Sequence, residues 1–223
     1  MTASWTIVVP SVRLAENSSR LGTEARRLTR AIALDTVAAI AAARLVEQII
    51  VINDEPDATD AFTALSPNVT VVPAEKDTET LDIPAVVHSV TGVADGPVVV
   101  VRPILPALDS VAVSSMLDGA ESVDFGVLED FHGRSGTTAL IAKHATRLGA
   151  FPTTLKIERP AGAQLLGLSA TLHKSATSAR DIAHLRSEPS LGARTRVAAA
   201  ALLLELPTKE SGRRYGIDPP PQN

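Results

Sequence analysis

The residues best suited to bind an anion follow the first apolar run of the chain, in the segment PSVRLAENSSRLG. This segment contains Arg13, Arg20 and several hydroxyl side chains ahead of a stretch with helical periodicity. Free backbone N–H groups at a helix start favour negative charge, so the loop could hold a phosphate or a carboxylate. Ordinary loop charges in water remain the alternative. The glycine patterns of a Walker A loop and of a dinucleotide fingerprint are missing.

A second group of small and hydroxyl residues occurs in GRSGTTAL, residues 133–140. Two threonines beside a glycine at the start of a strand permit a close approach of ligand to backbone, but an ordinary hairpin turn needs the same residues. The segment VVVVRPILPALDS, residues 98–110, has the pattern of a buried strand that enters a loop. The only charged side chain of that loop before Asp109 is Arg102.

Carboxylates that could hold a metal ion stand near the expected ends of strands: Asp54, Asp82, Asp109, Glu129, Asp130 and Asp181. Phosphoryl chemistry with Mg²⁺ needs at least two carboxylates that converge, and a linear sequence does not show convergence. We expect most of them to be surface charges or helix caps. The histidines are dispersed without HExxH spacing, and no Gly-x-Ser-x-Gly elbow occurs, so neither zinc chemistry nor serine hydrolysis is indicated.

The composition excludes several classes of function. The chain of 223 residues has no cysteine and a net charge of −4, with its lysines and arginines scattered. Thiol chemistry and thiolate metal sites are therefore excluded, and no basic footprint for nucleic acid or an anionic membrane is present. No apolar stretch is long enough to span a bilayer, and the start lacks the pattern of a signal peptide. We expect a soluble, cytoplasmic protein that binds small ligands.

Apolar, β-branched runs alternate with segments of helical periodicity through the first half of the chain. Strands are expected at residues 6–11, 48–53, 69–74 and 96–101, and helices at 23–44, 58–66, 81–93 and 109–119. Thr23 is the expected N-cap of the first helix, and Pro84 lies in the first turn of the third. This alternation predicts an α/β fold around a mostly parallel sheet. Such sheets bind ligands beyond the carboxyl ends of their strands.

The pattern changes after Gly119. Residues 123–130 and 136–143 are expected to form two strands of a hairpin, which gives the sheet a small antiparallel part. A stretch rich in proline and glycine, residues 151–169, precedes two helical pieces, of which 194–206 is the clearer. We expect one domain over residues 1–206 and a disordered, polar, proline-rich tail over 207–223.

Several segments match, in type and order, the motifs of one enzyme family. VVPSVRL and SSRLG resemble a strand followed by Pro-x-Lys-x-Leu and Lys-Ser-Arg-Leu, and EDFHGRSGTTAL resembles an Asp, a glycine turn and Gly-Thr-Thr/Asn-Ala-Leu. GLSATLH resembles Gly-x-x-Ser-x-x-x-His, and LGARTRVAAALL resembles a Gly-x-Gly-x-Arg-Thr ending. Over about residues 5–204 the chain thus resembles the CofC/FbiD family, the 2-phospho-L-lactate or phosphoenolpyruvate guanylyltransferases of deazaflavin coenzyme (coenzyme F420) biosynthesis.

The resemblance implies a fold, an activity and a set of site residues. The fold is the three-layer fold of the nucleotidyltransferases, and the activity is transfer of GMP from GTP to a phosphorylated three-carbon acid, with Mg²⁺. The resemblance assigns the nucleotide to Arg13, Arg20 and Asp82 and the metal to Asp130 and Asp181. It assigns the phospho-acid to Gly136, Thr137, Thr138, Ser169 and His173.

The departures from the family pattern fall on charged positions. Two family lysines correspond to Val12 and Ser18, the Asp of Asp-Leu-Pro corresponds to Ile104, and the partner of Asp181 corresponds to Ala183. An aliphatic residue cannot ligate Mg²⁺, which takes oxygen ligands. Two hypotheses therefore stand: a working guanylyltransferase, and a catalytically inactive paralogue that keeps the fold for ligand binding, regulation or partner assembly. The sequence leaves oligomeric state open, a homodimer included.

Overall fold

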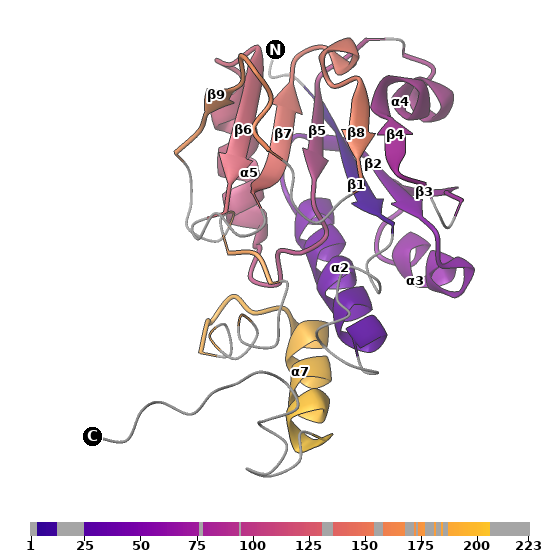
Figure 1. Ribbon diagram of the computed structural model, residues 1–223, viewed down its shortest axis with the longest axis vertical. Helices are drawn as coiled ribbons and strands as arrows, with labels where there is room; N and C mark the ends of the chain where they lie inside the picture. The colour runs from indigo at the N-terminus through magenta and orange to yellow at the C-terminus, as the bar shows by residue number, and fades with distance from the viewer. Residues whose placement is uncertain are drawn as a thin grey trace.

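The computed structural model describes residues 4–12, 25–75, 78–93, 95–130, 136–153, 158–167, 172, 174–176, 181, 184 and 187–205. A seven-stranded sheet with the strand order β3-β2-β1-β5-β7-β6-β9 forms its centre (Figure 1). A separate two-stranded sheet joins β4 and β8. The predicted tail, residues 207–223, and the predicted N-cap Thr23 lie outside the described residues.

Four strands at the centre are parallel, as the alternation of strands and helices predicted. They are β1 (Trp5–Ser11), β2 (Val46–Asn53), β3 (Val69–Pro73) and β5 (Val98–Val101). β1 pairs with β2 on one side and with β5 on the other. β5 is buried along its whole length, which explains its run of four valines.

The hairpin predicted after Gly119 is confirmed. It joins β6 (Phe125–Glu129) to β7 (Thr137–Ala142), and β7 also pairs antiparallel with β5. The short β9 (Gln164–Leu165) adds to β6 in parallel. In the described sheet, β7 is the strand that runs opposite to all the others.

Helices and the small sheet cover both faces of the large sheet, which gives three layers. One apolar core packs α2 (Ala25–Ala41), α3 (Thr59–Thr63) and α5 (Ser110–Ala120) against Ile7, Val9, Val99 and Val101. The other packs α4 (Ile83–Thr91) and the small sheet of β4 (Thr80–Asp82) and β8 (Ala150–Pro152) against the alternate residues Val8, Val98 and Val100. Two short 3-10 helices, η2 (Pro56–Ala58) and η3 (Ala145–Arg147), lie in the connections.

The last described helix, α7 (Ala193–Glu205), packs against α2 in the lower part of Figure 1. The carboxylate of Asp35 in α2 accepts hydrogen bonds from the backbone N–H of Thr195 at 2.7 Å and from Arg194 Nη1 at 3.2 Å. Asp35 is buried, so this carboxylate both caps α7 and ties it to α2. No helix in the described part of the chain is long and apolar enough to cross a membrane.

Some predicted boundaries differ from the structure, and some short strands were not predicted. The first helix ends at Ala41 instead of Arg44, because Leu45 adopts a left-handed backbone with φ of 68°. The third helix begins at Ile83, since Thr80–Asp82 form β4. The strands β4, β8 and β9 were not predicted, because two or three residues are too few to show an alternating pattern.

Candidate functional site

The ends of the central strands lie at one edge of the sheet, which we call the carboxyl edge. It is formed by the carboxyl ends of β1, β2, β5 and β6 together with the start of the antiparallel β7. Figure 1 shows the arrowheads of β1, β5 and β6 at this lower end of the sheet. The buried polar residues at these ends include Ser11, Asn53, Arg102, Asp130 and Thr137. The carboxyl edge is where sheets of this type bind their ligands.

Arg102 lies at the end of β5 and is the buried cation of this edge. Its backbone N–H donates to the carbonyl oxygen of Thr138 at 3.0 Å, which extends the pairing of β5 and β7 by one residue. Its side chain is almost fully covered, with 6% of the residue exposed. Burial lowers the pKa of Arg102 to about 10, and the negative charge of Asp130 opposes this shift. Arg102 therefore stays charged at neutral pH.

Asp130 follows β6 directly and is also buried, with 7% of the residue exposed. Its backbone N–H donates to the carbonyl oxygen of Gly136 at 2.8 Å, so the two residues form the base of the β6–β7 connection. Gly136 has a φ of 65°, a left-handed conformation that favours glycine. The hydroxyl of Ser175 donates to Oδ1 of Asp130 at 3.0 Å. A buried carboxylate with these partners is held in place, not solvated.

Two neighbouring threonines at the start of β7 differ in their hydrogen bonding. The hydroxyl of Thr138 lies 3.0 Å from the carbonyl oxygen of Leu172 and 3.3 Å from that of Leu128, so it ties β7 to β6 and to the chain near residue 172. The hydroxyl of Thr137 is buried and has no hydrogen-bond partner within the described part of the chain. A buried hydroxyl without a partner costs about 1–3 kcal/mol, which makes Thr137 a candidate ligand contact.

The loop after Arg102 is covered by later parts of the chain. Every residue from 101 to 108 is buried. The carbonyl oxygen of Ile104 accepts from the N–H of Ala176 at 2.9 Å, and that of Pro106 accepts from the N–H of Gly192 at 2.8 Å. Ile104 itself is 7% exposed. An aliphatic residue suits this environment, where a carboxylate would need a compensating partner.

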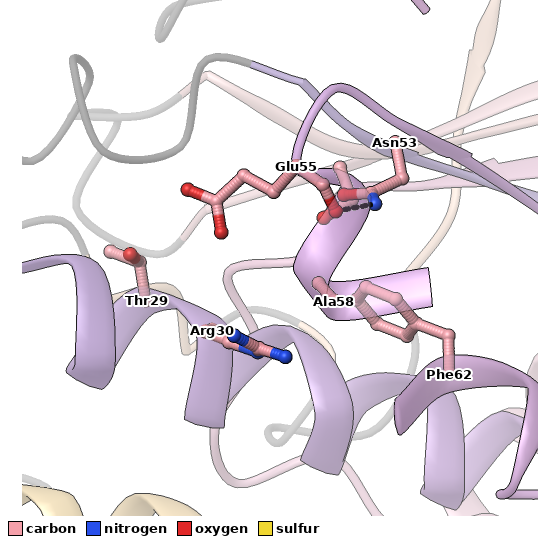
Figure 2. Close-up of a pocket in the computed structure, with 7 residues that line it drawn as sticks. Thr29, Arg30, Asn53, Glu55, Ala58 and Phe62 are labelled. Atoms are coloured by element: carbon pink, nitrogen blue, oxygen red, sulfur yellow. Dashed lines mark hydrogen bonds between the residues drawn. The ribbon is translucent and has the colours of Figure 1, made fainter. Parts of the chain in front are cut away.

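A small cavity lies beside the ends of β1 and β2. It is lined by Ser11, Thr29, Arg30, Asn53, Glu55, Ala58 and Phe62. Figure 2 shows Thr29 and Arg30 on α2 facing Asn53 and Glu55, whose backbone carbonyl accepts from Asn53 Nδ2 at 2.5 Å. The cavity volume of about 10 Å³ gives room for one water molecule at most, so it is not a nucleotide pocket. Burial raises the pKa of Glu55, although Arg26, 3.6 Å away, lowers it.

A larger groove of about 630 Å³ lies between α2 and α7, lined by apolar residues and by Arg27, Arg30 and Arg194. Arg30 is bound to Asp57 at 3.1 Å, and Arg194 is bound to Asp35. These arginines therefore have structural partners, and we assign no ligand to this groove.

Apart from Asp181, which is half-buried, the residues predicted for the site fall into three groups. Asp130, Gly136, Thr137 and Thr138 are brought together at the carboxyl edge. Asp82 is an exposed N-cap of α4, with Oδ1 accepting from the N–H of Ala85 at 3.1 Å. Asp82 lies next to Gly149 and Ala150, beyond the end of β7, and thus toward the opposite edge of the sheet. Arg13, Arg20, Ser169 and His173, and the replaced positions Ser18 and Ala183, lie outside the described residues.

Sequence reasoning did not assign Arg102 or Ser175 to the site. The signal for Arg102 was present, because it is the one charged side chain between an all-valine strand and a proline-rich apolar loop. No comparable signal marked Ser175, whose hydroxyl reaches Asp130 only in the folded chain.

The metal site predicted at Asp130 and Asp181 stays a prediction. No group of three or more His, Cys, Asp or Glu residues converges within the described ranges. Asp109, the next carboxylate after Ile104, caps α5 through the N–H of Ala112 at 2.8 Å. Asp181 is half-buried. The residues between 131 and 186 that the structure does not describe include no Asp or Glu, but the undescribed residues 13–24 after β1 include Glu16 and Glu24. Among the described residues at this edge, Asp130 is the buried carboxylate, and no second buried carboxylate stands beside it for a protein-held Mg²⁺.

Two known proteins are similar to almost the whole length of this chain. Phosphoenolpyruvate guanylyltransferase of Streptomyces scabiei (strain 87.22) is 33% identical over 217 residues, which cover 91% of this chain and 98% of that protein. Phosphoenolpyruvate guanylyltransferase of Streptomyces avermitilis is 33% identical over 222 residues, which cover 94% of this chain and 99% of that protein. No protein-family model matches the chain.

The fold also occurs among solved structures. A protein of Desulfovibrio desulfuricans G20, described as a candidate nucleotide-diphospho-sugar transferase, superimposes with a TM-score of 0.55 at 16% identity. The superposition covers 97% of this chain and 100% of that chain. At this identity the likeness shows the fold alone, and it is the three-layer nucleotidyltransferase fold that the sequence predicted.

Proposed function

Because the chain belongs to the phosphoenolpyruvate guanylyltransferase family, we propose that it transfers GMP from GTP to a phosphorylated three-carbon acid, phosphoenolpyruvate or 2-phospho-L-lactate. The observation that supports this proposal is the set of buried polar residues at the carboxyl edge around Arg102. It combines a buried cation, a buried carboxylate and the partnerless hydroxyl of Thr137. Such an edge suits a small anion that carries both a phosphate and a carboxylate.

The reaction is a single group transfer. A phosphate oxygen of the acid attacks the α-phosphorus of GTP, a new P–O bond joins GMP to that phosphate, and the bond from the α-phosphorus to the bridging oxygen breaks. Pyrophosphate leaves with the electron pair of that bond. Negative charge builds on the transferred group and on the leaving group, so the protein contributes mainly by positioning and by cationic stabilisation.

The roles of individual residues are proposals. Arg13 and Arg20 bind the triphosphate, and Thr137 binds the phospho-acid, while Thr138 positions β7 through its hydroxyl. Ser169 and His173 bind the carboxylate or phosphate of the acceptor. Mg²⁺ enters bound to the phosphates of GTP, as part of the nucleotide substrate. A cytoplasmic location and a homodimer stay predictions.

Two buried positions favour a second candidate function. Val12 and Ile104 are 3% and 7% exposed and stand where the family pattern places a lysine and an aspartate. A catalytically inactive paralogue would keep ligand binding at the carboxyl edge and lose the transfer step. The two functions differ in turnover, not in fold.

Release of pyrophosphate from GTP tests the proposed function. The full chain is incubated with GTP, Mg²⁺ and either phosphoenolpyruvate or 2-phospho-L-lactate, with reactions lacking the acid or containing ATP as controls. We expect release that depends on the acid and on GTP, and that falls in Arg20→Ala but not in the exposed control Arg44→Ala. Binding of GTP by calorimetry without any release would contradict the proposed activity and support the inactive paralogue.

A further inference from the structure

We propose that the phospho-acid half of the site uses a protein cation, Arg102, in place of a protein-held metal, so that the acid binds this chain without a divalent ion. The inference rests on the proposed function, because it names how the acid substrate is bound. It is carried by four observations at the carboxyl edge.

The first observation is the charge of Arg102 and its environment. The residue is 6% exposed, and its pKa of about 10 leaves it protonated at neutral pH. An anion that reaches this guanidinium is bound with little water around it, and an ion pair is stronger in such surroundings than at an open surface. A guanidinium also presents five N–H donors in a planar fork that matches phosphate and carboxylate oxygens.

The second observation is the engagement of Asp130, the residue best placed to hold a metal. Its carboxylate accepts from Ser175 and interacts with the charge of Arg102. A fixed positive charge beside a carboxylate opposes the approach of a divalent cation by the same Coulomb interaction that favours an anion. Asp130 thus positions Arg102 and does not serve as a metal ligand.

The third observation is the set of side chains around the pair. Ile104, two residues after Arg102, offers no oxygen ligand, and the described residues contain no cluster of three potential ligands. Undescribed residues between 131 and 186 contribute no carboxylate by sequence, whereas the undescribed residues 13–24 after β1 include Glu16 and Glu24. Among the described residues at this edge, Asp130 therefore has no second buried carboxylate beside it for Mg²⁺.

The fourth observation is the buried hydroxyl of Thr137 at the same end of the sheet. It has no partner in the described chain, and the backbone carbonyl oxygen of the neighbouring Thr138 accepts a hydrogen bond from the N–H of Arg102. Burying a hydroxyl without a partner costs free energy, so this donor points to a ligand that restores the hydrogen bond. A phosphate oxygen of the acid accepts such a bond.

Calorimetric binding of phosphoenolpyruvate tests the inference without relying on turnover. The full chain is titrated in excess EDTA and in excess Mg²⁺, each with and without a non-hydrolysable GTP analogue. We expect dissociation constants in the two buffers that agree within about twofold. Mn²⁺ added to the protein alone should stay free in its electron paramagnetic resonance spectrum.

Variants separate a binding role from a folding role. Arg102→Met together with Asp130→Leu removes both charges and leaves no buried ion unpaired, so it is the variant that should stay folded. It should weaken phosphoenolpyruvate binding by about tenfold or more, the scale of a charge-assisted hydrogen bond. Arg102→Lys, which keeps the charge but not the fork, should weaken binding less. Arg44→Met, at an exposed arginine paired with Asp118, is the matched control.

The outcomes are distinguishable. Binding that is lost in EDTA and restored by Mg²⁺ overturns the inference and leaves the proposed function standing. No binding in either buffer, with or without the GTP analogue, contradicts the proposed function and the inference together. Unchanged binding in the double variant contradicts the role of Arg102 alone.

Discussion

The backbone N–H of Ala176 donates a hydrogen bond of 2.9 Å to the carbonyl oxygen of Ile104. This bond joins a later part of the chain to the loop that follows β5. Together with the bond from Gly192 to Pro106, it covers the loop and explains why residues 101–108 are all buried. The position where the family pattern has an aspartate is thus an interior position in this chain.

Replacing Ile104 by aspartate tests whether this interior position tolerates a carboxylate. We expect the free energy of unfolding to fall by about 2–4 kcal/mol, because a charge enters a site that is 7% exposed. Ile104→Val removes one methylene and should cost about 0.5–1.5 kcal/mol. Urea unfolding of both variants measures the difference. An aspartate variant as stable as the valine variant would show that a partner for the carboxylate is already present.

The adjacent threonines of β7 provide a matched pair. Thr138→Val removes the hydroxyl that reaches the Leu172 carbonyl at 3.0 Å, and we expect a loss of about 1 kcal/mol. Thr137→Val removes a buried hydroxyl without a described partner, so its stability should be unchanged or higher. Phosphoenolpyruvate binding should nevertheless weaken in Thr137→Val. Equal destabilisation of both variants would mean that Thr137 is a structural residue.

Gly192→Ala tests the junction between α2 and α7. A methyl group at this position would overlap the carboxylate of Asp35, which is held by the N–H of Thr195. Because Asp35 must move or the loop must shift, we expect a loss of about 1–3 kcal/mol. Gly167→Ala is the control, since a methyl group there meets open space. Thermal unfolding should show a lower Tm for the first variant only; equal Tm values would contradict the close packing.

Glu55→Gln tests the electrostatics beside the small cavity. The pKa of Glu55 is raised above 4.5 by burial, so the folded state holds the proton more tightly than the unfolded state. Stability therefore falls as the pH rises from 4.5 through the raised pKa, and the charged side chain is unfavourable at neutral pH.

The glutamine variant should have a slightly higher Tm at pH 7. A change of 1 kcal/mol shifts the Tm of a domain of this size by about 2–4 °C, and we expect a smaller shift than that. The difference should vanish as the pH falls below 4.5, where Glu55 is protonated in both states. Glu47→Gln, at an exposed position of β2, is the control. A lower Tm at pH 7 would show that the attraction of Arg26 outweighs burial.

The order of the long elements could be predicted from the sequence. Runs such as residues 98–101 are β-branched and buried on both faces, so they are recognisable without knowledge of their neighbours. The end of α2 was missed because Leu45, a residue that rarely adopts a left-handed backbone, does so here. The pairing of β4 with β8 depends on contacts about 70 residues apart, which no local pattern records.

The candidate site was predicted only in part, for a similar reason. Motif resemblance placed Asp130 and Gly136–Thr138 together, and the structure brings them to one edge of the sheet. The capping role of Asp82 and the electrostatic interaction of Arg102 with Asp130 depend on the folded geometry. The sequence alone does not indicate that Arg102 lies near Asp130, because the two residues come together only when strands β5, β6 and β7 are assembled.

A crystal structure of the full chain with phosphoenolpyruvate and Mn²⁺, with anomalous data at the manganese edge, tests the central claim most directly. We predict the phosphate or carboxylate of the acid within hydrogen-bond distance of the Arg102 guanidinium, and no manganese bound to Asp130. An anomalous peak coordinated by Asp130, with the acid bound through that metal and Arg102 away from it, would contradict the account.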